Sequence, residues 1–291
     1  MSIADEIKQS FKSGSTLTKL IYINLAVFLA VKLIAVFYFL FTIQGDFSLV
    51  RFFAVPADLS KLLYKPWTIF TYMFLHQDFL HILFNMLWLY WFGQIFLHYF
   101  DQKKLVSVYI LGGFAGAFIY ILTFNIFPVF SDIIPVSYAL GASASVIAIV
   151  IAASVYAPNH TIYLMFFGPV KLKYIALVTI AIDIISIAST NAGGHLAHLG
   201  GALFGYIYIV QLKKGNNIAG FFDRFMDSVF SIFKPKPKIK VTYKRPADDI
   251  EYNKSKLQKQ AEIDKILDKI AQSGYESLTK QEKEILFKNS K

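Results

Sequence analysis

The chain has 291 residues, of which 56% are hydrophobic, and its mean hydropathy is +0.50. This composition excludes an ordinary soluble globular domain, and the absence of Cys excludes a disulfide scaffold, a thiol nucleophile and a Cys-based metal site. The formal net charge of +10 is concentrated from Lys213 onward, with 18 Lys and Arg against 11 Asp and Glu, which favours a cytoplasmic membrane surface over a nucleic-acid partner.

Residues 1–19 form a predicted cytoplasmic N-terminal segment. Asp5 and Glu6 occur there without an early apolar core, so we expect no cleaved signal peptide. Leu20 to Phe41 form the first predicted membrane helix, interrupted by Lys32, which we interpret as a residue that faces the bundle or reaches the membrane surface. Thr42 to Lys65 is predicted to be a partly embedded or interfacial loop.

Five further membrane helices are predicted, so that residues 20–212 form a six-helix membrane domain. The apolar block Pro66 to Phe100 is too long for one span, and His76, Gln77 and Asp78 divide it. The predicted spans are Phe79 to His98, Leu105 to Phe127, about Tyr138 to Ala157, Leu172 to Ser189 and His195 to Val210. The fold class is therefore an all-α membrane protein, a six-transmembrane-helix bundle with a short C-terminal helical extension.

The charges of the loops indicate the orientation of these helices. Lys residues precede the first span, lie between the second and third, and precede the fifth, and the basic tail follows the sixth. Because positively charged loops stay in the cytoplasm, both termini are predicted to be inside. Arg51, Lys61 and Lys65 after the first span weaken this contrast without reversing it.

Residues 213–245 are predicted to form an amphipathic helix and a basic linker. Two interpretations of the helix remain open: it lies on the membrane, or it packs on the underside of the bundle. Its apolar positions are Ile218, Phe221, Phe222, Phe225, Met226, Val229 and Phe230, and the linker contains Phe233 to Lys238.

Residues 246–291 are predicted to form a small cytoplasmic helical module. Thr279 and Glu282 have the spacing of a capping box at the start of a last short helix. The preceding helix ends at Ser273-Gly274, and its apolar positions are Ile263, Ile266, Leu267 and Ile270. Nothing in this module indicates chemistry, so we expect a role in interaction or regulation.

A candidate nucleophile, Ser143, lies in the stretch Gly141-Ala142-Ser143-Ala144-Ser145 that opens the fourth apolar helix. The N–H groups and positive dipole end of a helix N-terminus would face an oxyanion formed beside it. A serine nucleophile needs a base, and His198 is the best candidate. Small residues would allow close approach of the helices, namely Ala197, Gly201 and Gly205 on the sixth span, Gly141, Ala142, Ala144, Ala148 and Ala152 on the fourth, and Gly112, Gly113 and Gly116 on the third.

His81 and Asn85 are candidates for stabilising the oxyanion. They lie four residues apart, so both project from one face of the second span. His81, Ser143 and His198 each lie near the start of a helix that begins on the outer side, so we expect them at similar depth. Either His81 or Asn85 alone is as simply explained as an interhelical hydrogen-bonding residue, and their catalytic role is favoured because they form a pair at the expected depth.

The segments PWTIFTYMFLH, HILFN, GASAS and AHLGGALFG, in this order, make the chain resemble the rhomboid family of intramembrane serine proteases over roughly Leu20 to Val210. The resemblance implies a six-helix bundle that cleaves transmembrane substrates near their outer ends. By motif position, Ser143 would be the nucleophile and His198 the general base and acid. His81 and Asn85 would help to hold the oxyanion.

Several residues depart from the family pattern or compete with these assignments. Ala144 follows the serine where the family usually has Gly, and Ile147 occupies a position that is often aromatic. Ser145 is a rival nucleophile that faces away from the GxS register. We expect structural roles for His76 and His195 and no catalytic use for His98 or His160, which lie at predicted cytoplasmic ends. Asp183 is a membrane acid that could orient a histidine, but the family's dyad favours a structural polar contact.

The sequence therefore predicts a serine endopeptidase that hydrolyses transmembrane protein substrates in the lipid bilayer by a Ser-His dyad, with no cofactor, no metal and no nucleic-acid partner. HExxH and GxGD motifs are absent, which disfavours zinc and aspartyl mechanisms. The alternatives are a catalytically silent rhomboid-like protein that binds membrane clients and a small transporter. The expected location is a bacterial plasma (inner) membrane; the sequence does not indicate the oligomeric state.

Overall fold

The computed structural model describes residues 3–42, 49–164, 168–233 and 249–288. The chain divides into two units, Met1–Phe233 and Lys234–Lys291. Each unit is considered by itself. The basic linker predicted at Lys234 to Lys238 lies outside the described residues.

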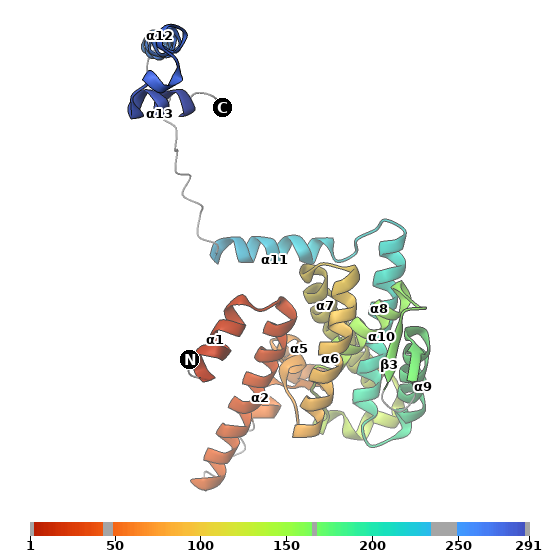
Figure 1. Cartoon of the computed structure of the whole chain (residues 1–291). Coiled ribbons are helices and arrows are strands. Elements are labelled where there is room, and N and C mark those ends of the chain that lie inside the picture. The colour runs from red at the N-terminus through yellow and green to blue at the C-terminus, as the bar shows by residue number, and fades with distance from the viewer. Residues whose placement is uncertain (1–2, 43–48, 165–167, 234–248, 289–291) are drawn as a thin grey trace. The chain divides into compact units, whose positions relative to one another are not determined.

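The first unit is a bundle of helices (Figure 1). Hydrogen bonds from backbone N–H groups to Ser15, Asp78 and Asp101 cap the first turns of three of them. The main helices are α1 (Ile3–Ser13), α2 (Thr16–Leu40), α6 (Phe79–Tyr99), α7 (Gln102–Ile126), α8 (Ser143–Tyr156), α9 (Leu172–Ile185) and α10 (Ala192–Lys213). Helices thus occupy the positions of all six predicted spans.

Three of the described helices, α2, α6 and α7, are long and apolar enough to cross a membrane. α8 is apolar but has only 14 residues. The chain is therefore a multi-pass membrane protein. The six predicted crossings are more than these lengths and compositions establish.

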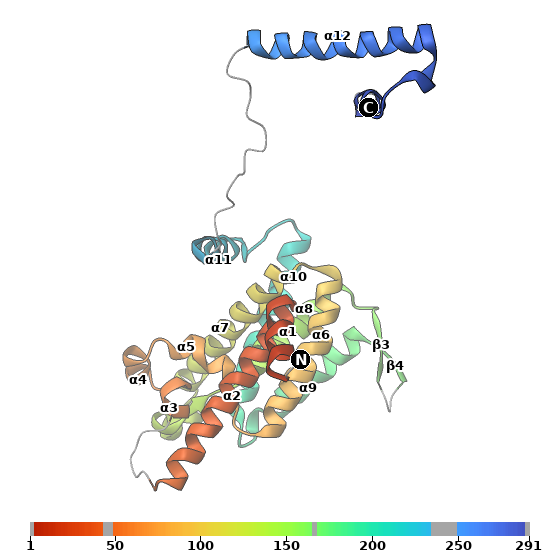
Figure 2. The same cartoon turned by 60° about the vertical axis from the view of Figure 1, so that its left-hand side comes forward.

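The segment predicted as an interfacial loop, Thr42 to Lys65, contains regular structure, and its prediction as a loop was wrong where it is described. It holds α3 (Leu49–Phe53), the strand β1 (Val55–Pro56) and α4 (Leu59–Tyr64), and α5 (Thr68–Thr71) and the 3-10 turn η1 (Tyr72–Phe74) follow. Asp58 caps α4 by accepting hydrogen bonds from the N–H groups of Ser60 and Lys61. Figure 2 shows α3, α4 and α5 together at one side of the bundle. Residues 43–48 lie outside the described residues.

Two small antiparallel sheets make the protein mostly helical rather than all-α. β1 pairs with β2 (Tyr138–Ala139), and β3 (Thr161–Leu164) pairs with β4 (Gly168–Lys171). The 3-10 segments η2 (Pro128–Val136) and η3 (Ser186–Ala188) precede β2 and α10. Two-residue strands carry no periodic pattern, so the sequence alone does not reveal the β1–β2 pairing.

Helices α7, α8 and α10 form the tightest packing in the first unit through the small residues that the sequence analysis identifies. A Cβ atom placed on Gly201 would lie 2.1 Å from the carbonyl oxygen of Ala144, and one on Gly205 would lie 2.3 Å from that of Ala148. A Cβ on Gly112 of α7 would meet the Cβ of Ala148 at 2.3 Å. The predicted close contact is confirmed, because no larger residue fits between these backbones.

Lys32 of α2 has a specific partner, in agreement with its predicted structural role. Its ammonium group donates a hydrogen bond of 2.6 Å to the carbonyl of Gln77, just before α6. It also lies 5.6 Å from the ring centroid of Phe28. Near the opposite end of the bundle, Lys213 donates to the carbonyl of Val155 at 2.8 Å and lies 5.6 Å from the ring centroid of Tyr156.

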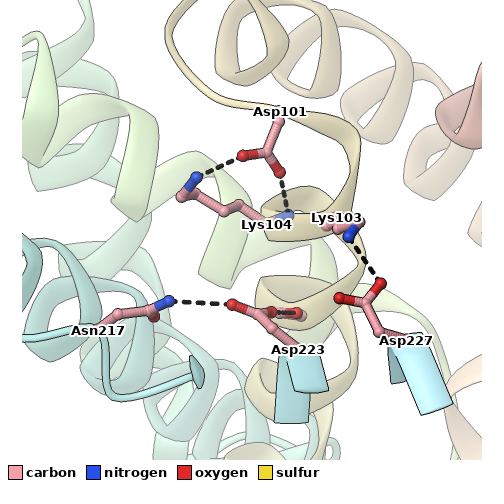
Figure 3. Close-up of polar contacts among 7 residues, drawn as sticks. Asp101, Lys103, Lys104, Asn217, Asp223 and Asp227 are labelled. Carbon is pink, nitrogen blue, oxygen red and sulfur yellow. Dashed lines mark hydrogen bonds and ion pairs between the residues drawn. The ribbon is translucent and has the colours of Figure 1, made fainter. Parts of the chain in front are cut away.

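The amphipathic helix α11 (Gly220–Phe233) contacts the start of α7. Figure 3 shows Lys103 of α7 paired with Asp227 at 2.6 Å, and Asn217 donating to Asp223 at 3.0 Å. The hydroxyl of Ser107, which is buried, also donates to Asp223. Because the Lys103–Asp227 pair is exposed to water, it contributes little, and the Asp223 contact is the stronger attachment.

These contacts agree with the interpretation that α11 packs on the underside of the bundle. Phe221 and Phe225 remain 77% and 54% exposed on it, as the alternative of a helix that lies on the membrane also predicts. The side chains of Val229 and Phe230 lie outside the described residues.

The second unit contains α12 (Asp249–Ser273), the turn η4 (Tyr275–Ser277) and α13 (Lys280–Lys288). Gly274 ends α12 with a φ of +76°, which a residue with a side chain rarely adopts. The capping box is confirmed: Glu282 accepts from the Thr279 N–H at 2.7 Å and donates its own N–H to the Thr279 hydroxyl at 3.3 Å. Lys269 joins the two helices through Glu282 at 2.8 Å.

Candidate active site

One cavity of about 1250 Å³ opens in the first unit, and the four candidate site residues all line it. His81 and Asn85 come from α6, Ser143 from the start of α8 and His198 from α10. The structure thus brings together residues that span 118 positions of the sequence, from 81 to 198. The volume of this cavity exceeds the roughly 300–1000 Å³ that is typical of small-molecule pockets. It is therefore large enough for a peptide segment.

The segment before Ser143 is fixed by backbone hydrogen bonds to the region that sequence analysis predicts as a loop. β2 pairs with β1, and the N–H of Gly141 donates to the carbonyl of Tyr72 at 3.0 Å. Gly141 has a φ of +131°, and a Cβ atom there would lie 2.9 Å from Nε2 of His81. Glycine is therefore required both by the backbone conformation and by the close imidazole.

Ser143 is the first residue of α8, so the helix begins at the candidate nucleophile. The first N–H groups of an α-helix have no partner within the helix, and the residue that precedes it, Ala142, supplies no side-chain cap. These donors are available to an anion beside Ser143. Within the described ranges, no hydrogen bond joins the Ser143 hydroxyl to His198.

His81 and Asn85 are held by local hydrogen bonds at the start of α6. Asp78 accepts from the N–H of His81 at 2.8 Å, and Asn85 donates its side-chain amide to the carbonyl of His81 at 2.8 Å. The N–H of Gln77 donates a long hydrogen bond of 3.4 Å to Nδ1 of His81. An imidazole that accepts at Nδ1 carries its hydrogen on Nε2, which is the nitrogen beside Gly141.

Asp183 of α9 contacts two histidines of α10. Its Oδ1 lies 2.8 Å from Nδ1 of His198 and 2.8 Å from Nδ1 of His195. The ligand atoms of the three residues lie within 4.8 Å of one another, a spacing that could hold a metal ion. The sequence predicts no metal, and both Nδ1 atoms are already at hydrogen-bond distance from the carboxylate. Sequence reasoning favours a structural contact for Asp183, whereas its contact with His198 favours the orienting role.

The competing residues lie elsewhere. Ser145 is fully buried, and its hydroxyl points to the sulfur of Met73 at 4.0 Å. Ile147 packs with Ile151 and Ala202 in a small apolar cluster. His160 forms a hydrogen bond of 2.8 Å with Tyr99.

Tyr120 of α7 lines the cavity and is missed by the sequence analysis. Its side chain is 1% exposed, and its hydroxyl has no hydrogen-bond partner in the part of the chain that the structure describes. A tyrosine among many aromatic residues in an apolar span gives no sequence signal of such a position. Asp183 does give a sequence signal, because an acidic residue in a membrane span is costly unless it has a partner.

Comparison with known families agrees with this architecture. A rhomboid domain matches residues 64–214, which are more than half of the chain and include all four candidate residues. The chain belongs to the rhomboid family. A further match, to a family of unknown function (DUF6576), covers residues 248–291 of this rhomboid protein, in its second unit.

Individual relatives are distant. The rhomboid protein is 31% identical over 157 residues to RHOMBOID-like protein 12, mitochondrial, of Arabidopsis thaliana, covering 51% of this chain and 47% of that protein. It is 27% identical over 84 residues to the rhomboid protease GlpG of Salmonella paratyphi A, covering 29% of this chain and 30% of that protein. The match therefore spans about half the length of the curated relatives or less.

Proposed function

We propose that this rhomboid protein is an intramembrane serine endopeptidase with Ser143 as nucleophile and His198 as general base and acid. The observation that carries the proposal is the convergence of Ser143, His198, His81 and Asn85 on one cavity. Family membership supports it, and the relatives from Salmonella are named as proteases.

The proposed reaction proceeds through an acyl-enzyme. Oγ of Ser143 attacks the carbonyl carbon of the substrate while His198 accepts the hydroxyl proton. His198 returns this proton to the leaving amine as the C–N bond breaks. A water molecule then attacks the ester, giving a proton to His198, and the released Ser143 oxygen takes it back. Free carboxylate and amine are the two products, so no cofactor or oxidant is needed.

The oxyanion of each tetrahedral intermediate would lie at the start of α8. The unpartnered N–H groups of that helix supply part of its stabilisation. The Nε2–H of His81 lies beside Gly141 and is a second candidate donor. Asn85 supplies the rest through the amide hydrogen that its bond to the His81 carbonyl leaves free.

The proposed substrate is a transmembrane protein whose helix unwinds locally. A helical segment keeps its carbonyl groups hydrogen-bonded within the helix, so only an extended segment offers a carbonyl to Ser143. The cavity of about 1250 Å³ has the volume for such a segment. The six helices in span positions, with both termini inside, remain our proposal for the topology, and the bacterial inner membrane our proposal for the location.

The test is cleavage of a model transmembrane substrate by the full chain reconstituted in lipid vesicles. We expect Ser143→Ala and His198→Ala each to lower kcat by several orders of magnitude, on the order of 10⁴ to 10⁶, as when members of one catalytic unit are removed. Matched controls are Ser145→Ala and His160→Ala, which change the same residue types outside the cavity and are expected to keep the activity.

Three outcomes would count against the proposal. If Ser143→Ala and wild type cleave at equal rates, another group acts as nucleophile. If wild type cleaves none of several substrates yet binds them, the client-binding alternative replaces the protease. A solute flux that survives Ser143→Ala would favour the transporter.

A further inference from the structure

Asp183 is the most deeply buried acid at the candidate site. It is 4% exposed as a residue, and its position in α9 places it in a span-like helix. An acid there costs free energy unless hydrogen bonds compensate, and two imidazole N–H groups on one oxygen supply them. The arrangement is specific, because His195 and His198 are three residues apart and therefore project from one face of α10.

The contact has a consequence for the protonation of His198. An ionised carboxylate only accepts hydrogen bonds, so the hydrogen of His198 lies on Nδ1. Nε2 is then left with its lone pair and can accept a proton in the cavity. His81 is in the opposite state, since it accepts at Nδ1 from the N–H of Gln77. One imidazole of the cavity is thus set as an acceptor and the other as a donor.

We propose that Asp183 is a positioning residue that holds His198 in the tautomer with a free Nε2, giving this rhomboid a Ser143–His198–Asp183 relay in place of a simple dyad. The inference rests on the proposed function and deepens it. The carboxylate also stabilises the imidazolium that forms when His198 takes the proton of Ser143. It does not itself take the proton.

His195 acts as a brace in this arrangement. It shares Oδ1 with His198 but does not line the cavity, and its side chain is 19% exposed. By occupying the carboxylate from a second direction it restricts the rotation of the Asp183 side chain. Loss of His195 therefore loosens Asp183 without removing its charge, and a smaller effect on activity follows.

The decisive variant is Asp183→Asn, which keeps the size of the side chain and removes its charge. In the reconstituted full chain we expect kcat to fall by about 10² to 10⁴-fold with little change in KM, as when a histidine-orienting aspartate is neutralised in a serine hydrolase. Asp183→Glu should recover part of the loss, and His195→Ala should lower kcat by about tenfold or less. The rate at which a fluorophosphonate labels Ser143 should fall with kcat.

A matched control distinguishes the positioning role of Asp183 from a purely structural role. Asn24 is a fully buried polar residue of α2 that bonds to Tyr109 at 3.2 Å and lies outside the cavity. Asn24→Leu should lower the unfolding temperature and leave kcat and the labelling rate within about twofold. Thermal unfolding of every variant shows whether Asp183→Asn is folded. If Asp183→Asn does not fold, kcat of Asp183→Glu tests the same role.

The outcomes separate this inference from the proposed function. If Ser143→Ala is inactive while Asp183→Asn and wild type have equal kcat, the relay is wrong and the dyad stands. If wild type is itself inactive, or Ser143→Ala is active, the proposed function fails first. If a chelator removes activity and Zn²⁺ restores it, the cluster holds a metal and the relay is overturned.

Discussion

Buried polar side chains cost free energy in this bundle unless a partner offsets the loss of water. Asn24 and Asp183 each have such partners. His76 is different: it is 3% exposed, and among the described residues neither ring nitrogen has a partner of ordinary hydrogen-bond geometry. Burial, with the neighbouring imidazole of His81 adding to it, lowers the pKa of His76 to about 4.

This shift predicts a pH dependence of stability. Between the unfolded value of 6.5 and the folded value of about 4, the unfolded chain binds the proton at His76 and the folded one does not. The contribution of His76 to the free energy of unfolding is therefore fully present above pH 6.5. It is lost as the pH decreases to about 4, by ~3 kcal/mol in total. Thermal unfolding over a pH series should show this loss in wild type and a smaller one in His76→Leu. A variant of the exposed His98, His98→Leu, should follow wild type, and equal slopes for all three would contradict the assignment.

At this scale the sequence predicts the identity of the cavity residues better than their contacts. Ser143, His81, Asn85 and His198 are identifiable because each lies at a helix start, on one face, or beside a stripe of small residues. The contact of Asp183 with both histidines depends on how η3 turns the chain between α9 and α10, and no spacing in the sequence specifies that turn. For the same reason, the sequence does not predict that Tyr120 lines the cavity.

Among the elements, α8 is held by backbone contact on two sides. Gly112 and Gly116 of α7 approach Ala148 and Ala144, and Gly201 of α10 approaches the carbonyl of Ala144. This close fit positions Ser143, because α8 cannot shift without meeting another backbone. The spacing of small residues predicts it, since glycine and alanine are the residues that allow helices to pack this closely in membranes.

Gly201→Ala tests this packing. The new methyl group would lie 2.1 Å from a backbone oxygen, so α10 and α8 must separate. We expect a loss of about 1–3 kcal/mol of stability, as for other overpacked sites, together with a fall in kcat because Ser143 moves relative to His198. Thermal unfolding and substrate cleavage measure the two effects.

The matched control is Gly220→Ala at the start of α11. A Cβ there would meet only the side chain of Asn217, at 3.5 Å, which is ordinary contact. Alanine also favours a helix over glycine, so this variant should be neutral or slightly stabilised. Equal destabilisation of the two variants would show that the α8–α10 contact is looser than described.

The elements themselves are predicted unevenly. Sustained apolar runs with acidic or hydroxyl caps predict helix ends to within a few residues of those observed, as α2 and α6 illustrate. The elements between residues 49 and 64 are not predicted, because the helices there have five or six residues and the strand has two. Elements this short are stabilised by tertiary contact, such as the burial of Val55 and Ala57, and not by a local pattern.

Across the whole molecule, the two units respond to acid in different ranges. The membrane unit contains His76, whose protonation matters between pH 6.5 and about 4. The second unit depends on Glu282, whose pKa the hydrogen bond from Lys269, with those from Thr279, lowers to about 2. A carboxylate with a lowered pKa stabilises the fold above its unfolded pKa of 4.5, and the contribution is lost as the pH falls through about 2.

We therefore expect the α12–α13 contact to loosen between pH 4.5 and about 2. Since the chain has no Cys, Ser255→Cys and Gln281→Cys would attach a pair of fluorophores at those two positions only. Their energy transfer should fall over this range in the full chain, whereas Glu282→Gln should show the lower value at neutral pH. Glu284→Gln, at an exposed position of α13, serves as control. If the energy transfer changes neither with pH nor in Glu282→Gln, the contact between Lys269 and Glu282 does not hold these helices together.

The length of α8 has a consequence for the bilayer around the protein. Fourteen residues make a helix of about 21 Å, roughly 10 Å shorter than a hydrocarbon core of about 30 Å. Tyr156 and Lys213 at one end are residues typical of a membrane interface. In the topology that we propose, with that end at one surface, Ser143 lies about 10 Å inside the opposite boundary. Under the proposed function, the acyl-chain thickness of the surrounding lipid thus sets how far water must penetrate to reach Ser143, and which stretch of a substrate helix lies at the same depth.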